Sequence, residues 1–376
     1  MHLKSWSVFC AGAVFAWAAC GQARAQSAPA AAAPAKTAEQ VFKNIKALQG
    51  TAADQLMPAM QFIAASLGVE CDFCHVQGKF DSDEKPHKET ARKMIAMTLA
   101  INKDNFSGHR EVTCYSCHRG ANDPVGTPPV LSEDEKPEHA EAASTAGAAA
   151  LPTPEQVLEK YVAALGGAEA IHKISSRVEK GNIIFGGHES PIEVFAKAPN
   201  KRMSVTHSDR GESITAFDGT VGWLGNTGRS ARDMQGAEIE AVKLDADFYF
   251  ATHAKEIFSQ FRMGHPDKIG DQPVYTVIGL RQGQPPVRLY FDRSSGFLLR
   301  LVRYADTPVG RNPTQIDYAD YREVDGVMLP FRWTLARPNG RFTIQIKEVQ
   351  QNVPIDDEKF TKPQTAAGAG SGASGH

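Results

Sequence analysis

The stretch Val112-Thr113-Cys114-Tyr115-Ser116-Cys117-His118 has a near copy 43 residues earlier, Val69-Glu70-Cys71-Asp72-Phe73-Cys74-His75. Both contain C-x-x-C-H, the attachment motif of c-type haem. Two thiols three residues apart lie on one side of a tight helical turn, where both can reach the vinyl edge of one porphyrin. The histidine that follows points its imidazole at the iron. The sequence therefore predicts two covalently bound haem c groups, with His75 and His118 as proximal ligands.

The four motif cysteines leave only Cys10 and Cys20, which fall in a predicted export signal. A structural zinc ion is an alternative use of two C-x-x-C pairs. However, 39 residues separate Cys74 from Cys114, whereas zinc ribbons separate their pairs by about 15–20 residues. A redox-active dithiol would need a thioredoxin-like βαβ context, which the surrounding pattern does not predict. Haem is therefore the favoured interpretation.

Methionine is the expected sixth ligand, because Met/His coordination is typical of cytochromes c. Met60 lies 11 residues before Cys71, on a predicted helix that ends at Gly68. Met94 lies on a predicted helix over residues 87–102, ahead of the second motif. We expect Met60 to serve the first haem and Met94 the second.

Other axial ligands stay open at this stage. Met57 and Met97 are the local alternatives to Met60 and Met94. A methionine on an apolar helix face more often packs in a core than binds a metal. His109, five residues before Cys114, is a further candidate ligand or a surface loop residue.

Residues 1–25 are typical of an export signal, with Lys4 before an apolar segment from Trp6 to Ala19. The Ala23-Arg24-Ala25 sequence predicts cleavage before Gln26. The alternative is a lipid anchor at Cys20. Either interpretation predicts a periplasmic or otherwise exported protein, membrane-associated if Cys20 is lipidated.

The pattern of periodicity changes near residue 150. Two helices are predicted before the first motif: the helix of Met60 and an earlier one with apolar residues at Ala38, Val41, Ile45 and Leu48. After Ser175 the apolar residues instead recur with a period of two. Turn dipeptides such as Asp218-Gly219 and Asp325-Gly326 predict hairpins. Strands are expected near residues 178–184, 192–196, 203–205, 274–280, 287–292, 298–304, 315–323, 331–336 and 342–349, with one helix over 247–261.

These patterns predict a multidomain chain, α and then α+β, in which a small helical dihaem cytochrome c module precedes an antiparallel β half-barrel with helices. The expected parts are a signal peptide (1–25), a disordered segment (26–36), the dihaem module (37–127), a linker (128–152), the half-barrel (153–362) and a disordered tail (363–376). The net charge of −2 gives no reason to expect nucleic acid as a partner.

The motifs, with "MQFIAASLGVECDFCH", "ARKMIAMTLAIN" and "VTCYSCHRG", resemble the cytochrome c subunit of photosynthetic reaction centres over about residues 38–124. The resemblance implies thioether links at all four motif cysteines, proximal His75 and His118, and distal Met60 and Met94. Members of that family usually carry four haems, whereas this chain has two motifs. "YVAALGGAEAI" and "FDGTVGW" more weakly resemble outer-membrane lipoprotein carrier and sorting domains, which implies an apolar ligand in the second half.

The expected function is electron transfer between redox proteins of the periplasm or inner membrane, rather than enzyme catalysis. Six-coordinate His/Met iron leaves no open position for a substrate. A dihaem oxidoreductase of the peroxidase type is the first alternative, and it needs a haem with an open position. A lipid or lipoprotein-binding protein with an appended cytochrome module is the second. No catalytic constellation stands out in the second half, where Asp218 and Trp223 are interpreted as a turn residue and a packing aromatic.

Overall fold

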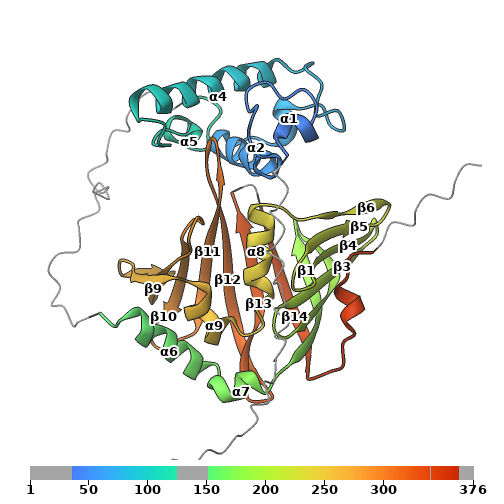
Figure 1. Ribbon diagram of the computed structural model, residues 1–376, viewed down its shortest axis with the longest axis vertical. Coiled ribbons are helices and arrows are strands. Elements are labelled where there is room, and N and C mark those ends of the chain that lie inside the picture. The colour runs from blue at the N-terminus through green and yellow to red at the C-terminus, as the bar shows by residue number, and fades with distance from the viewer. Residues whose placement is uncertain (1–35, 125–150, 339, 364–376) are drawn as a thin grey trace, which may run out of the picture. The chain divides into compact units, whose positions relative to one another are not determined.

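The structure is a computed structural model that describes residues 36–124, 151–338 and 340–363. The predicted export signal with Cys20, most of the predicted linker and the predicted tail lie outside these residues. Helices occupy the first described range, and strands with helices occupy the second (Figure 1). The N-terminal helices are α1 (Ala38–Val41), α2 (Ala53–Leu67), α3 (Cys71–Cys74), α4 (Pro86–Asn105) and α5 (Cys114–His118).

Helix α2 buries Leu56, Ala59 and Ile63, which share one face at helical spacing. It ends at Gly68, whose φ of 67° is the left-handed conformation that glycine adopts readily at helix ends. The prediction that α1 extends to Leu48 is wrong, because the helix stops at Val41. Asn44 has a φ of 59°, and its side-chain amide donates to Asp83 at 2.8 Å, so the chain turns there.

Helix α4 buries Lys88, Ile95, Thr98 and Asn102, which lie on one face of the helix. Met94 and Met97 lie outside this face and are exposed. In the ranges 36–124 and 151–363, no helix is both long and apolar enough to cross a membrane.

The described residues after 150 form one antiparallel sheet of 14 strands. Its strands are β1 (Ser176–Phe185), β2 (His188–Lys197), β3 (Lys201–Ser208), β4 (Gly211–Phe217), β5 (Gly222–Asn226), β6 (Arg229–Asp233), β7 (Gln260–Met263), β8 (Asp267–Ile269), β9 (Gln272–Leu280), β10 (Val287–Asp292), β11 (Leu298–Thr307), β12 (Gly310–Val324), β13 (Val327–Arg337) and β14 (Gly340–Gln351). The expected antiparallel sheet is confirmed, and strands cover every range in which one was predicted.

The sheet is open, and its strand order shows which strands form its two edges. Strand β1 pairs with both β2 and β14, and the order runs from β6 at one edge to β7 at the other, with β8 paired to β9. The chain passes between the two edges through α8 (Ala237–Ala246) and α9 (Phe250–Ile257). Both helices lie on the concave side of the sheet (Figure 1). Leu244 of α8 and Ala254 of α9 are buried in the same apolar core as the inward side chains of the strands.

The single helix predicted over 247–261 is wrong in its limits. Within that range the structure has only α9, and β7 begins at Gln260, while α8 lies before it and was not predicted. In α8 the buried residues Val242, Leu244 and Ala246 alternate with polar ones. This spacing is typical of a strand, so α8 has no clear helical pattern of apolar residues.

The remaining helices pack against the sheet and its core. They are α6 (Pro154–Ala164), α7 (Ala168–His172) and a 3-10 helix, η1 (Asp357–Phe360). Phe360 is fully buried beside Trp223, and the indole Nε1 of Trp223 donates to the Phe360 carbonyl at 2.8 Å. Truncating either aromatic to alanine should cost about 3–5 kcal/mol of stability.

Candidate haem sites and cavity

Each C-x-x-C-H motif forms a single helical turn. Cys71 and Cys74 begin and end α3, and Cys114 and Cys117 lie within α5. Residue 113 is extended, and its N–H donates to Ser116 Oγ at 3.0 Å, which fixes the start of α5. Three residues of helix return the chain by nearly one turn, so each pair of thiols lies on one side of its turn.

The two motif histidines make the same hydrogen bond. His75 Nδ1 lies 3.0 Å from the carbonyl oxygen of Phe80, and His118 Nδ1 lies 3.1 Å from that of Ala121. A carbonyl only accepts, so Nδ1 carries a proton in both rings, and in the neutral imidazole Nε2 then keeps its lone pair. This is the arrangement that orients a metal-binding histidine, and it fits iron ligation through Nε2.

Burial lowers the pKa of His75, and the nearby charges of Lys88, Arg92 and Lys85 lower it further, against the opposing effect of the Phe80 hydrogen bond. Neutral imidazole is the form that binds a metal. The surroundings of His75 therefore favour the state that a haem ligand needs.

Lys88 is a candidate functional residue that the sequence patterns did not single out. Only 8% of this lysine is exposed. Its ammonium donates to the Phe80 carbonyl at 2.9 Å and to the Ser82 carbonyl at 2.7 Å. The carbonyl that orients His75 is thus also bonded to a cation. The available signal was that Lys88 lies seven residues before Ile95, on one helix face.

Asn102 stabilises the segment before the second motif, and the sequence patterns did not single it out either. Its side-chain amide donates to the Val112 carbonyl at 2.7 Å, and its oxygen accepts from the N–H groups of Glu111 and Val112 at 3.0 and 2.9 Å. Asn102 is buried. Three hydrogen bonds from one side chain hold the segment that leads into Cys114.

The predicted methionine ligands lie on different helices. Met60 is half-buried against the core of the N-terminal helices, whereas Met94 and Met97 are 37% and 45% exposed. Helix α2, which carries Met60, packs against α5, and α4 packs against α3 and α5. The assignment of each methionine to an iron stays a prediction, and His109 is exposed in the loop after α4.

The N-terminal helices expose an unusual number of large apolar side chains. Eight of the twelve that are exposed in the described residues lie in 36–124: Val41, Phe42, Met57, Phe80, Met94, Met97, Phe106 and Tyr115. Uncovered apolar surface of this kind marks a binding site or an interface. The residues present therefore fit two porphyrins, which would cover apolar side chains beside α3 and α5.

The alternatives to haem fit the cysteines less well. Burial raises the pKa of Cys74 and of Cys114, whereas a redox-active cysteine needs a lowered pKa. Within 36–124 and 151–363, no three His, Cys, Asp or Glu side chains gather closely enough to hold a metal ion. A zinc site built from both cysteine pairs is therefore not formed by these residues.

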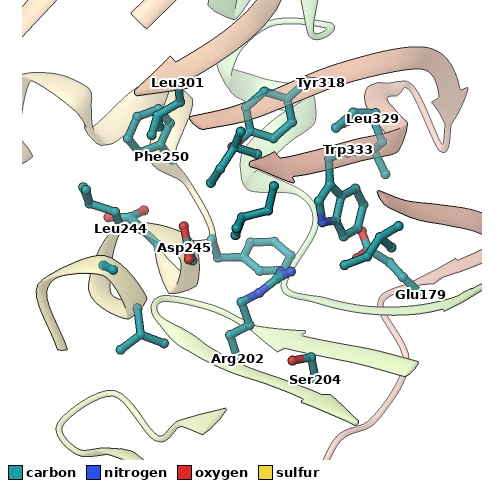
Figure 2. Close-up of a pocket in the computed structure, with 18 of the residues that line it drawn as sticks. Glu179, Arg202, Ser204, Leu244, Asp245, Phe250, Leu301, Tyr318, Leu329 and Trp333 are labelled. Carbon is teal, nitrogen blue, oxygen red and sulfur yellow. The ribbon is translucent and has the colours of Figure 1, made fainter. Parts of the chain in front are cut away.

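A cavity of about 660 Å³ lies against the concave face of the sheet. One wall, from β11 to β14, carries apolar and aromatic side chains such as Leu301, Leu329 and Trp333. Arg202 and Ser204 come from β3 on the facing side, and Asp245 comes from α8 (Figure 2). This volume is in the range of small-molecule sites, and sequence reasoning predicted only an apolar ligand here.

Residues 15–186 match the family model described as the photosynthetic reaction centre cytochrome C subunit. The N-terminal part of this chain resembles a cytochrome c. The match confirms the predicted resemblance and extends beyond residues 38–124 at both ends.

Curated relatives support the same resemblance over a limited length. The chain is 31% identical over 99 residues to the photosynthetic reaction center cytochrome c subunit of Thermochromatium tepidum, which is 25% of this chain and 24% of that protein. It is 34% identical over 85 residues to cytochrome c-554 of Chloroflexus aurantiacus, which is 21% and 20% of the two chains. The chain thus matches about a quarter or less of the length of each relative.

Solved structures similar to this chain cover a larger share of it. A LolA superfamily protein from Nitrosomonas europaea is 15% identical with a TM-score of 0.39, covering 56% of this chain and 99% of its own. A DUF1329 family protein from Desulfovibrio piger is 11% identical with a TM-score of 0.40, covering 56% and 98%. Similarity at this level indicates no ligand, so the ligand of the cavity must be inferred from its lining residues.

Proposed function

We propose that this protein is an exported dihaem c-type cytochrome that carries electrons between redox proteins. The observation that carries the proposal is the repeated turn: two thiols on one helical turn, followed by a histidine whose Nδ1 is bonded to a carbonyl. The resemblance to reaction-centre cytochrome c subunits over residues 15–186 supports it. Two motifs give two haems, one at Cys71 and Cys74 and one at Cys114 and Cys117.

When bound, haem c supplies reversible one-electron chemistry. The residues of this chain would anchor each porphyrin through two thioether links and orient one histidine through its carbonyl acceptor. Met60 and Met94 would supply the opposite ligands. A complete set of six ligands would exclude substrate from the iron. The chain would then contribute by positioning the ligands and by providing surroundings of low dielectric constant. The partners would be redox proteins of the periplasm or the inner membrane.

Spectroscopy of the oxidised holoprotein tests this function against the peroxidase alternative. An electron carrier with His/Met ligands should show two low-spin haems by EPR and the near-red Met–iron charge-transfer band. A high-spin haem with peroxide turnover would contradict the carrier function and support the alternative.

The cavity favours a second candidate function, the binding of an apolar or partly apolar ligand. Its wall from β11 to β14 is largely apolar, and its volume is about 660 Å³. Native mass spectrometry of protein purified from membranes should detect a co-purifying small molecule. Protein that is free of ligand, and that takes up no added amphiphile, would contradict this function.

A further inference from the structure

The two walls of the cavity differ in polarity, and the difference starts in β3 and β4. In an ordinary sheet that packs on a core, the inward side chains are apolar. Here Ser204 pairs with Thr215 and Thr206 pairs with Ser213 across the two strands, and all four line the cavity. The hydroxyl groups therefore face inward.

The apolar residues of the same strands face the other way. Met203 and Val205 of β3 and Ala216 of β4 pack in a separate core with Trp223 and Phe360. Because successive side chains alternate between the two faces of a strand, this outer core forces the polar residues of β3 and β4 into the cavity. The inward polarity is thus part of the fold, covered outside by η1.

Charged residues line the cavity in equal numbers of each sign: Arg177, Arg202, Arg303 and Arg337, with Glu179, Glu238, Asp245 and Asp247. Most of the carboxylates have a cationic partner. Asp245 binds Arg303 through both oxygens, at 2.5 and 2.9 Å, and Glu238 binds Arg232 through both oxygens at 2.7 Å.

The other two carboxylates are compensated as well. Asp247 lies 3.2 Å from the ring of His253, and its oxygen also accepts from the Tyr249 N–H at 3.0 Å. Glu179 lies 3.8 Å from Arg177 on the same strand. Each carboxylate of the cavity therefore already has a partner in the protein.

Two cavity arginines, Arg202 and Arg337, have no carboxylate within 4.0 Å of the guanidinium among the described residues. Arg337 is exposed at the end of β13, whereas Arg202 is half-buried. The side chain of Arg202 extends from β3 into the space between Asp245 and the facing aromatic wall (Figure 2). Arg177 aligns with Ala196, which aligns with Arg202, so the two arginines lie on the same face of the sheet two strands apart. The buried Nε of Arg177 has no hydrogen-bond partner in the described ranges.

We propose that the cavity binds an amphiphile with an acidic headgroup, a carboxylate or a phosphate ester, which pairs with Arg202. This inference rests on the second candidate function, ligand binding in the cavity, and adds the chemical class of the ligand. Guanidinium groups bind carboxylate and phosphate through short, charge-assisted hydrogen bonds. The hydroxyls of Ser204 and Thr215 lie on the same face as Arg202 and can donate to the same headgroup.

The apolar part of the ligand would lie along the opposite wall. Trp333, Leu335 and Ile344 line the cavity from β13 and β14. Trp333 and Ile344 are directly opposite each other across these strands, which gives a continuous apolar surface. Burial of a hydrocarbon chain there is favourable at about 25 cal/mol per Å² of apolar surface. An acidic amphiphile is therefore complementary to both walls at once.

Calorimetric titration of the full-length holoprotein tests this inference with four probes: dodecanoate, dodecyl phosphate, dodecanol and inorganic phosphate. We expect one or both acidic amphiphiles to bind at least about tenfold more tightly than dodecanol, the size of one charge-assisted hydrogen bond. Tighter binding of dodecyl phosphate would indicate a phospholipid-like ligand, and tighter binding of dodecanoate a fatty acid. Arg202→Gln should reduce both to the affinity of dodecanol.

Two further variants serve as controls. Arg202→Lys keeps the charge and should keep part of the preference for acidic probes. Arg332→Gln removes an exposed arginine beside Trp333, on the outer face of β13, and should change nothing. If dodecanol binds as tightly as the acidic amphiphiles, the proposed acidic headgroup is wrong, but ligand binding in the cavity still stands. If inorganic phosphate binds as tightly as dodecyl phosphate, the proposal that the ligand is an amphiphile is wrong. If none of the four probes binds, both the ligand-binding function of the cavity and the acidic headgroup are wrong.

Discussion

The Nδ1 atom of His118 lies 3.1 Å from the carbonyl oxygen of Ala121, and His75 repeats this relationship with Phe80 at 3.0 Å. In both sites the acceptor follows the histidine by a few residues, so the local chain itself orients the ring. Because this hydrogen bond lies within a few residues of the motif, it can be present in both copies of the motif. The two copies therefore have the same ligand chemistry and differ in what surrounds them.

Replacing Met60 tests the assignment of the sixth ligands. Met60→Leu removes the sulfur and keeps the volume, so we expect one of the two haems to lose its Met–iron band and to have a lower midpoint potential. Met57→Leu, on the same helix but 55% exposed, is the matched control and should keep both bands. If instead Met57→Leu abolishes the band, Met57 is the ligand.

Lys88 should raise the potential of the haem bound by His75. Lys88→Met removes a nearly buried cation and leaves the Phe80 carbonyl to His75 alone. Both changes favour oxidised iron. We expect one midpoint potential to fall by about 30–60 mV, since about 59 mV corresponds to 1.4 kcal/mol for one electron. Redox titration measures this directly, and Lys93→Met, an exposed lysine on the same helix, should have little effect.

Asn102 should control how well the second motif is formed. Asn102→Leu removes three hydrogen bonds and leaves the Val112 carbonyl and two N–H groups without their partner. We expect a loss of about 2–4 kcal/mol of stability and incomplete haem attachment at Cys114 and Cys117. Asn105→Leu, at the exposed end of the same helix, is the comparison. Full attachment and unchanged stability in Asn102→Leu would contradict this role.

Asp292 gives the β-rich part a defined acid sensitivity. Burial raises the pKa of its carboxyl, but hydrogen bonds from Ser294 and Ser295 outweigh burial, so the pKa lies below its ordinary value. A lowered folded pKa stabilises the fold above the unfolded pKa, near 3.9, and this contribution is lost as the pH falls through the folded value. Asp292→Asn should therefore cost about 1–2 kcal/mol at pH 7 and progressively less below about pH 4.

Urea unfolding at several pH values measures this difference. Asp209→Asn, in the exposed turn between β3 and β4, is the matched control and should show the same unfolding midpoint as the wild type at each pH. A difference between wild type and Asp292→Asn that stays constant from pH 7 to pH 3 would contradict the assigned role of this carboxylate.

Sequence reasoning located the features that depend on local pattern. The C-x-x-C-H turns are local, and so is the strand pattern that predicted β1 to β3 and β9 to β14. Strands β4 to β8 were missed. In β6 all residues but one are exposed, so its pattern shows no buried face to detect.

The features that were missed depend on contacts between distant segments. Lys88 reads as an ordinary surface lysine until the loop at Phe80 covers it. From the sequence, Arg202 would be interpreted as a solvent-exposed strand residue. In the structure η1 covers the opposite face of β3, so the polar face with Arg202 lines the cavity. Such placements follow from tertiary packing, which overrides local preference.

Intact mass spectrometry of the purified, full-length protein tests the central claim most directly. The measured mass should equal that of the mature polypeptide plus two covalently attached haems, and it should fall by one haem in the Cys114→Ala/Cys117→Ala double variant. A mass without haem, or one that includes a zinc ion held by intact cysteines under native conditions, would contradict the proposal that this chain is a dihaem cytochrome.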